Sequence, residues 1–98
     1  MWILKAQAAE SDPLTFRIRS GAIKTVGRAP RADFIVDAAL VSRLHCRLTA
    51  TNDSLEVEDL KSTNGTFVND QRIERAQLAN GDLLRVGRFE LKVEQQAS

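Results

Sequence analysis

The chain has 98 residues, 43% of them hydrophobic and 28% charged, which is enough for one packed domain without disulfide bonds. Its formal net charge of +1 argues against strong nonspecific attraction to nucleic acid or to an anionic membrane, because that attraction needs clustered basic charge. The single cysteine, Cys46, excludes an intramolecular disulfide bond, and no apolar stretch is long enough for a signal peptide or a transmembrane span. We therefore expect an intracellular, cytoplasmic domain.

The first third of the chain consists of short runs in which apolar and polar residues alternate, a pattern typical of β-strands with one buried face. The first such run covers residues 2–8, and a turn at residues 10–13 separates it from a second run at 14–18. A break at a Ser-Gly pair precedes a third run, residues 23–27, and a short apolar run follows at 34–36. The sequence predicts four short strands here, the last of them buried.

The stretch from residue 41 to residue 51 allows two interpretations. Ser42 is a good helix N-cap, and an apolar stripe at helical spacing follows it. Alternatively, the stretch is a strand with Cys46, Leu48 and Ala50 pointing inward and His45, Arg47 and Thr49 pointing outward. We favour the strand, because it leads through a turn at residues 52–53 into a cleanly alternating run at 55–58, and the two would pair as a hairpin.

The second half of the chain shows the same spacing of short runs and tight turns. A hydroxyl-rich loop follows residues 59–60 and leads to a predicted strand at 66–68 and a turn at 69–70. Residues 72–78 form an irregular segment or two very short strands, and a turn follows at 80–82. The last predicted elements are a hairpin of 83–86 with 89–94 and a tail or linker start at 95–98. This gives about ten or eleven strands. The sequence therefore predicts an all-β fold, an antiparallel β-sandwich.

Three short runs carry polar groups at predicted strand ends. They are Gly27-Arg28, residues 41–45 with Ser42, Arg43 and His45, and the run Lys61-Ser62-Thr63-Asn64-Gly65-Thr66. Together they supply two guanidinium groups, several small hydroxyls, an amide and an ammonium group, and no carboxylate lies within them. Guanidinium groups match phosphate oxygens in pairs, and hydroxyl and backbone N–H groups donate to the remaining oxygens. The combined set predicts a phosphate-binding site.

These runs, followed by Asn80-Gly81-Asp82 and Gly87, resemble in order and spacing the forkhead-associated (FHA) domain along nearly the whole chain. The resemblance implies an eleven-stranded β-sandwich, FHA/SMAD-like, that binds phosphothreonine peptides through the loops at one end. It also implies residue roles. Arg28, Ser42, Arg43, Ser62 and Thr63 would lie at the phosphate, Asn64 would hold the peptide backbone, Gly27, His45 and Gly65 would shape the loops, and Leu40, Lys61 and Asp70 are candidates for peptide specificity. Asp70 departs from the glycine that the family often carries there.

Catalytic and metal-binding interpretations are weaker. On an extended chain Ser42 and His45 face opposite sides, which disfavours a nucleophile–base pair, and Cys46 beside His45 has no further ligand to complete a metal site. We expect a phosphothreonine-peptide recognition module for signalling, residues 1–94, that is a monomer and needs no cofactor, metal, nucleic acid or membrane. The alternative is a phosphate-independent scaffold or oligomerisation domain of the same fold, which a comparison of phosphorylated and unphosphorylated peptides would distinguish.

Overall fold

The computed structural model describes residues 1–7 and 14–96, and its secondary structure there consists of β-strands alone. In chain order the strands are β1 (Trp2–Ala6), β2 (Thr15–Ile18), β3 (Ile23–Gly27), β4 (Phe34–Ile35), β5 (Cys46–Ala50), β6 (Leu55–Asp59), β7 (Thr66–Val68), β8 (Gln71–Ile73), β9 (Arg75–Leu78), β10 (Leu83–Val86) and β11 (Phe89–Gln95). Within the described part of the chain, no helix is long and apolar enough to cross a membrane.

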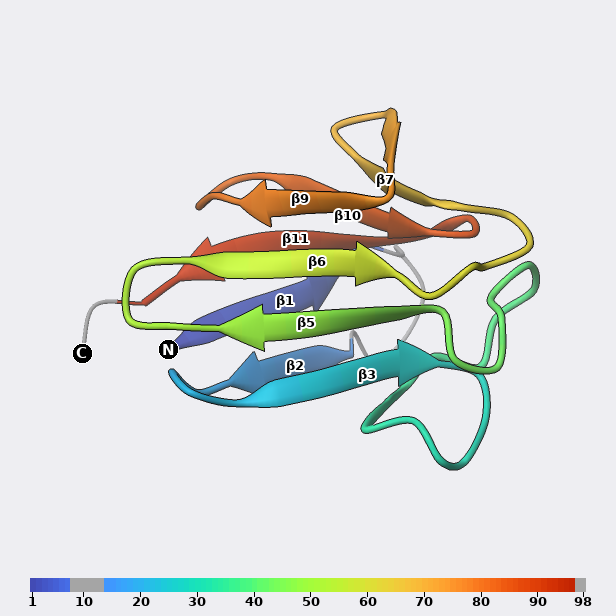
Figure 1. The fold of residues 1–98 in the computed structure, drawn as a ribbon, viewed down its shortest axis with the longest axis horizontal. Coiled ribbons are helices and arrows are strands. Elements are labelled where there is room, and N and C mark those ends of the chain that lie inside the picture. Colours follow the sequence, from blue (N-terminus) through green and yellow to red (C-terminus); the bar gives the residue numbers. More distant parts are fainter. Residues whose placement is uncertain (8–13, 97–98) are drawn as a thin grey trace.

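The strands form two stacked sheets. One sheet has six strands in the order β2-β1-β11-β10-β7-β8, and the other has five in the order β4-β3-β5-β6-β9. In Figure 1 the strands β3, β5 and β6 of the second sheet lie in front of β1, β10 and β11 of the first. The predicted all-β sandwich is confirmed. Its pairing is antiparallel except between β3 and β4, which run parallel because the chain returns to the same end of β3 through a loop.

The core lies between the two sheets and follows from the alternation seen in the sequence. On β5, Cys46, Leu48 and Ala50 are buried while Arg47 is exposed, so the strand interpretation of this stretch is confirmed. Trp2 at the start of β1 is also buried, and its indole N–H donates to the carbonyl oxygen of Thr51 at 3.3 Å. Burying a large apolar side chain stabilises the fold by about 1.5–3 kcal/mol each, which makes this interior the main source of stability.

Three details differ from the sequence predictions. His45 does not point outward from a strand: β5 begins one residue later, and the ring of His45 is fully buried beneath the loops. β4 is not fully buried, because Ile35 is 46% exposed at the sheet edge and only Val36 after it is buried. β11 continues to Gln95, whose backbone N–H donates to the side chain of Asn80. The predicted turn at 10–13, and the ends of the predicted first strand and tail, lie outside the described residues.

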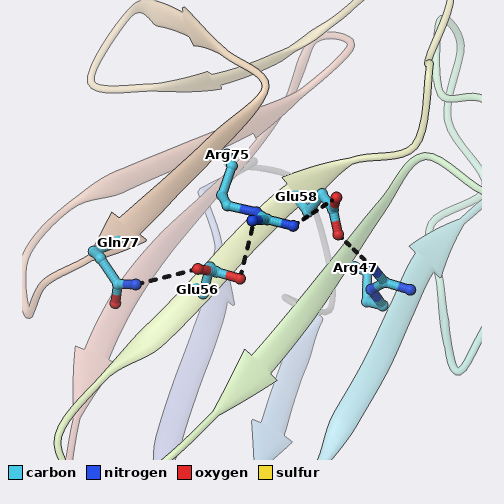
Figure 2. Close-up of polar contacts among 5 residues, drawn as sticks. All are labelled: Arg47, Glu56, Glu58, Arg75 and Gln77. Carbon is cyan, nitrogen blue, oxygen red and sulfur yellow. Dashed lines mark hydrogen bonds and ion pairs between the residues drawn. The ribbon is translucent and has the colours of Figure 1, made fainter.

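A ladder of charged side chains crosses the outer face of the five-stranded sheet (Figure 2). Glu58 on β6 accepts a hydrogen bond from Arg47 on β5 and another, at 3.0 Å, from Arg75 on β9. Arg75 also reaches Glu56 at 3.7 Å, and Gln77 donates to Glu56 at 3.3 Å. Opposite charges on neighbouring strands favour the observed register. They also leave both arginines of this ladder, Arg47 and Arg75, paired with carboxylates.

The loops that carry the polar runs gather at one end of the sandwich. β3 and β6 end there, β5 begins there, and the turn between β10 and β11 lies there too, on the right of Figure 1. β1 begins and β11 ends at the opposite end. The fold thus brings together three segments that are far apart in the sequence.

Candidate functional site

The loop end is built on a close backbone contact between the end of β3 and the segment before β5. A Cβ atom added to Gly27 would lie 2.0 Å from the carbonyl oxygen of Arg43, so only glycine fits at this position. Beyond it, the backbone N–H of Arg28 donates to Ser42 O and that of Ala29 donates to Arg43 O, both at 3.0 Å. Two predicted site segments are therefore held side by side by their backbones.

Arg28 is exposed, but its guanidinium group is held in place at one end. Its Nε donates to the carbonyl oxygen of Val41 at 3.1 Å, and its two terminal nitrogens form no ion pair within the described residues. An open groove of about 600 Å³ lies beside it. The groove is lined by Arg28, Asp37, Ala38, Ala39, Leu40, Val41, Ser42, Thr63 and Asn64. A partly anchored guanidinium group at a groove wall is a favourable donor for an anion, since less of its freedom is lost on binding.

Ser42 connects the segment before β5 with the β6–β7 loop. Its Oγ accepts a hydrogen bond from the backbone N–H of Thr63 at 3.1 Å. A hydroxyl group has one hydrogen to donate in addition to its acceptor sites, so the Ser42 hydroxyl hydrogen remains available to a ligand in the groove. Thr63 itself is exposed, and both residues lie on the groove wall.

The buried ring of His45 connects the same two loops through hydrogen bonds. Its Nδ1 accepts the backbone N–H of Ser42 at 3.0 Å, and its Nε2 lies 2.8 Å from the carbonyl oxygen of Gly65. Because a carbonyl oxygen only accepts, Nε2 carries the hydrogen, and the two contacts together select the neutral tautomer with a proton on Nε2. Both ring nitrogens are occupied by backbone groups. His45 therefore holds the loops and has no free nitrogen to act as a base on Ser42.

A second network holds the β6–β7 loop to the end of β6. The carboxylate of Asp59 accepts hydrogen bonds from Thr66 Oγ1 at 2.7 Å, from Ser62 Oγ at 2.5 Å and from the Ser62 backbone N–H at 3.1 Å. Ser62 Oγ in turn accepts the backbone N–H of Gly65, which has a positive φ of 92°. Burial alone would raise the pKa of Asp59, but the hydrogen bonds from Ser62 and Thr66 outweigh it and lower that pKa below its ordinary value.

Asn64 holds the far side of the groove. Its side-chain Nδ2 donates to the carbonyl oxygen of Leu40 at 3.1 Å. Leu40 has a positive φ of 71°, an uncommon conformation for a residue with a branched side chain, and this contact helps to stabilise it. The amide oxygen and the second N–H of Asn64 keep a hydrogen-bonding capacity that matches the C=O and N–H groups of a peptide main chain.

The structure brings most of the predicted site residues together and places the others elsewhere. Arg43 lines a neighbouring hollow and not the groove, and Lys61 lines a third one beside Glu58, Asp59, Glu74 and Arg75. Ser62 donates its hydroxyl hydrogen to Asp59, so its hydroxyl group points into the loop. Asp70 lies in the β7–β8 turn, paired with Arg85 at 3.4 Å, and is not among the groove residues.

Two charged residues at or near the groove are not among the site residues predicted from the sequence. Asp37 contributes a carboxylate to the groove wall, and Arg31 joins Arg28 and Arg43 around the neighbouring hollow. Neither belongs to a recognisable motif, since Asp37 follows a short strand and Arg31 lies in a Pro-containing loop. Only the folding back of residues 28–42 onto β3 reveals them.

Comparison with known proteins places this architecture in a family. The FHA domain profile matches residues 24–87. The glycogen accumulation regulator GarA of Mycobacterium tuberculosis is 41% identical over 70 residues, which cover 71% of this chain and 43% of GarA. The chain thus spans less than half the length of this curated relative.

Solved structures agree over the whole described fold. A structure from a study of phosphothreonine-dependent FHA domain interactions has a TM-score of 0.89 and 31% identity, covering 99% of this chain and 98% of that one. The FHA domain of FhaA, in complex with the intracellular domain of Rv3910, has a TM-score of 0.86 and 32% identity, covering 96% and 100%. The profile match, the fold and the clustered loop residues together show that this chain belongs to the FHA domain family.

Proposed function

We propose that this domain recognises phosphothreonine-containing segments of other proteins and thereby mediates phosphorylation-dependent protein–protein interactions in signalling. The observation that carries the proposal is the groove at the loop end, whose wall includes Arg28, anchored through its Nε, together with Ser42 and the exposed Thr63. Guanidinium and hydroxyl donors around an open groove suit a phosphate group with its several acceptor oxygens. A similar structure supports the same function, since it was determined in a study of phosphothreonine-dependent FHA domain interactions.

In this proposal Arg28 and Ser42 donate to the phosphate, with Thr63 and Arg43 at its margins, and Asn64 pairs with the peptide backbone. Gly27, His45, Ser62 and Gly65 hold the loops in position through the contacts described above. Leu40, whose carbonyl group accepts a hydrogen bond from Asn64, would meet a peptide side chain next to the phosphothreonine.

Binding without catalysis is the second part of the proposal. The best candidate for a general base, His45, is buried and uses both ring nitrogens on backbone groups. The only cysteine is buried in the core, where desolvation raises the pKa of its thiol far above the neutral range and makes it unreactive. Among the described residues, the candidate nucleophile Ser42 therefore has no activating partner, and we expect the bound phosphate to remain intact.

The test is a titration of the domain with one phosphothreonine peptide and its unphosphorylated form, repeated with Arg28→Ala. A charge-assisted hydrogen bond contributes roughly 1.5–3 kcal/mol, so the variant should bind the phosphopeptide about tenfold or more weakly. The control is the melting temperature of the variant, which should stay close to that of the wild type because an exposed charge adds little to stability. Equal affinities for the two peptides would favour a phosphate-independent scaffold instead.

A further inference from the structure

The loop end carries a second hollow, next to the groove, whose charge is entirely basic. It has a volume of about 590 Å³ and is lined by Arg28, Ala29, Pro30, Arg31, Arg43 and Leu44. Three of these six residues are arginines, and none is acidic. Arg28 lines the groove as well, so the two hollows meet at this one side chain.

The backbone holds the three arginines in position. Hydrogen bonds from Arg28 N to Ser42 O and from Ala29 N to Arg43 O fix Arg28 and Arg43 on adjoining segments. Arg31 lies in a turn that begins at Ala29, closed by the hydrogen bond from Ala32 N to Ala29 O at 3.0 Å. Pro30 suits the second position of such a turn because its φ is already fixed, and Ala32 anchors the turn in the interior.

The nearby carboxylate of Asp33 is used within the loop and does not neutralise the arginines. Its Oδ2 accepts the backbone N–H of Thr25 at 2.9 Å and the Thr25 hydroxyl at 3.1 Å. This pairing fixes the end of the Arg31 loop to β3. The carboxylate is therefore directed toward the strand and away from the hollow.

The arginines of this hollow differ in their ion pairing from those on the outer face of the five-stranded sheet. There, every arginine of the ladder in Figure 2 has a carboxylate within 4 Å. Across the described residues, by comparison, Arg28, Arg31 and Arg43 form no ion pair with any acidic side chain. Three like charges kept close together without a counter-charge repel one another, and binding an anion relieves that repulsion.

We propose that this hollow is a second anion subsite, which binds an acidic side chain of the same peptide whose phosphothreonine occupies the groove. The proposal rests on the proposed function and specifies its ligands: phosphothreonine segments with a carboxylate or a second phosphate a few residues from the phosphothreonine. The shared position of Arg28 supports one continuous ligand, because an extended peptide advances only about 3.3 Å per residue and can reach both hollows. Of the three arginines, Arg28 also lines the groove and Arg43 is assigned above to the margin of the phosphate, so Arg31 is the arginine whose replacement tests the second subsite by itself.

The experiment uses an alanine-based phosphothreonine peptide as the neutral reference. In a first set of peptides, aspartate replaces alanine at each flanking position in turn, and in a second set phosphoserine does so. At one or two positions the wild-type domain should bind the aspartate peptide about three- to tenfold more tightly than the reference, and the phosphoserine peptide more tightly still, because phosphate carries more charge. The gain should shrink as salt is added.

Two variants assign this gain to the hollow. Arg31→Gln should abolish the preference for the acidic peptide and bind the neutral reference within about twofold of wild type, whereas Arg31→Glu should reverse the preference. The matched control is Arg19→Gln, which removes one exposed positive charge at the opposite end of the sandwich and should leave the preference unchanged.

The outcomes for the second subsite and for the proposed function are distinguishable. If the neutral phosphopeptide binds in a phosphate-dependent way but no acidic position improves affinity, or if Arg31→Gln keeps the gain, the second subsite is refuted and the proposed function stands. If binding of every peptide is independent of phosphate, the proposed function is refuted, and the second subsite with it.

Discussion

Replacing Gly27 with alanine should disrupt the loop end, because the added methyl group has no room there. The new Cβ would lie 2.0 Å from Arg43 O and 2.9 Å from the Cα of Leu44. Both are backbone atoms, so no side-chain rotation relieves the clash. The end of β3 must move away from residues 42–44, and the two backbone hydrogen bonds from Arg28 and Ala29 lengthen or break.

The expected cost follows from these contacts. Overpacking of a tight site destabilises by about 1–3 kcal/mol. Each of the two weakened hydrogen bonds contributes about 0.5–1.5 kcal/mol net. We expect a loss of about 2–6 kcal/mol in the free energy of unfolding, which for a domain of this size lowers the melting temperature by about 10 °C or more. Urea denaturation of wild type and variant measures the difference.

Binding is the second measurement. Because the displaced backbone carries Arg28 and Arg43, phosphopeptide affinity should fall by more than tenfold at a temperature where the variant is still folded. The control is Gly21→Ala in the β2–β3 turn, where an added Cβ meets nothing within 4 Å and the positive φ of 89° alone costs about 1 kcal/mol. This control should bind like wild type. A Gly27→Ala variant that keeps both wild-type stability and wild-type affinity would refute the close contact on which both hollows depend.

Three further predictions concern the residues that hold the loops. Since the pKa of Asp59 is lower in the folded chain than in the unfolded one, its ionised form stabilises the fold above about pH 4, and that contribution is lost as the pH falls through the folded pKa. Urea denaturation between pH 2 and 5 should therefore show a shallower pH dependence for Asp59→Asn than for wild type, and an identical slope would contradict the assignment. His45→Ala leaves two backbone groups without partners and opens a cavity, so it should cost about 2–5 kcal/mol of stability by the same measurement, while a cost below 1 kcal/mol would mean that the ring is dispensable. Asn64→Ala should lower the affinity for every phosphothreonine peptide in a panel by a similar factor, corresponding to about 1–3 kcal/mol, whereas Leu40→Ala should change the order of the affinities. If Asn64→Ala changed that order, Asn64 would contact peptide side chains and not only the backbone.

Much of the strand framework could be predicted from the chain itself. Alternation of apolar and polar residues located β5 and β6 closely, and Asn-Gly, Asn-Asp and Gly-Asp pairs marked the turns between the later strands. These signals are local, because a strand that buries one face must alternate and a tight turn needs residues that tolerate its backbone angles. The three polar runs and their family resemblance likewise indicated which loops form the candidate site.

The arrangement of side chains at the loop end depended on contacts between segments distant in the sequence. The burial of His45 follows from the two loops that meet over it, and no periodicity within its own segment encodes that. The inward orientation of the Ser62 hydroxyl depends on Asp59 at the end of the preceding strand. Asp70 lies away from the groove because the β7–β8 hairpin turns it toward Arg85.

The sequence by itself determined that this chain is a β-sandwich with loops rich in hydrogen-bond donors. The tertiary structure alone decided which of those donors line the groove and which line the neighbouring hollow. Neighbours in sequence, Ser42 and Arg43, line different hollows, while Arg31 and Arg43, twelve positions apart, line the same one. The physical reason is the close contact at Gly27, which folds the chain after β3 back against the segment before β5. The segment before β5 bends at residues 43 and 44 and has no strand periodicity, so the surfaces packed on either side of it determine what each side chain meets.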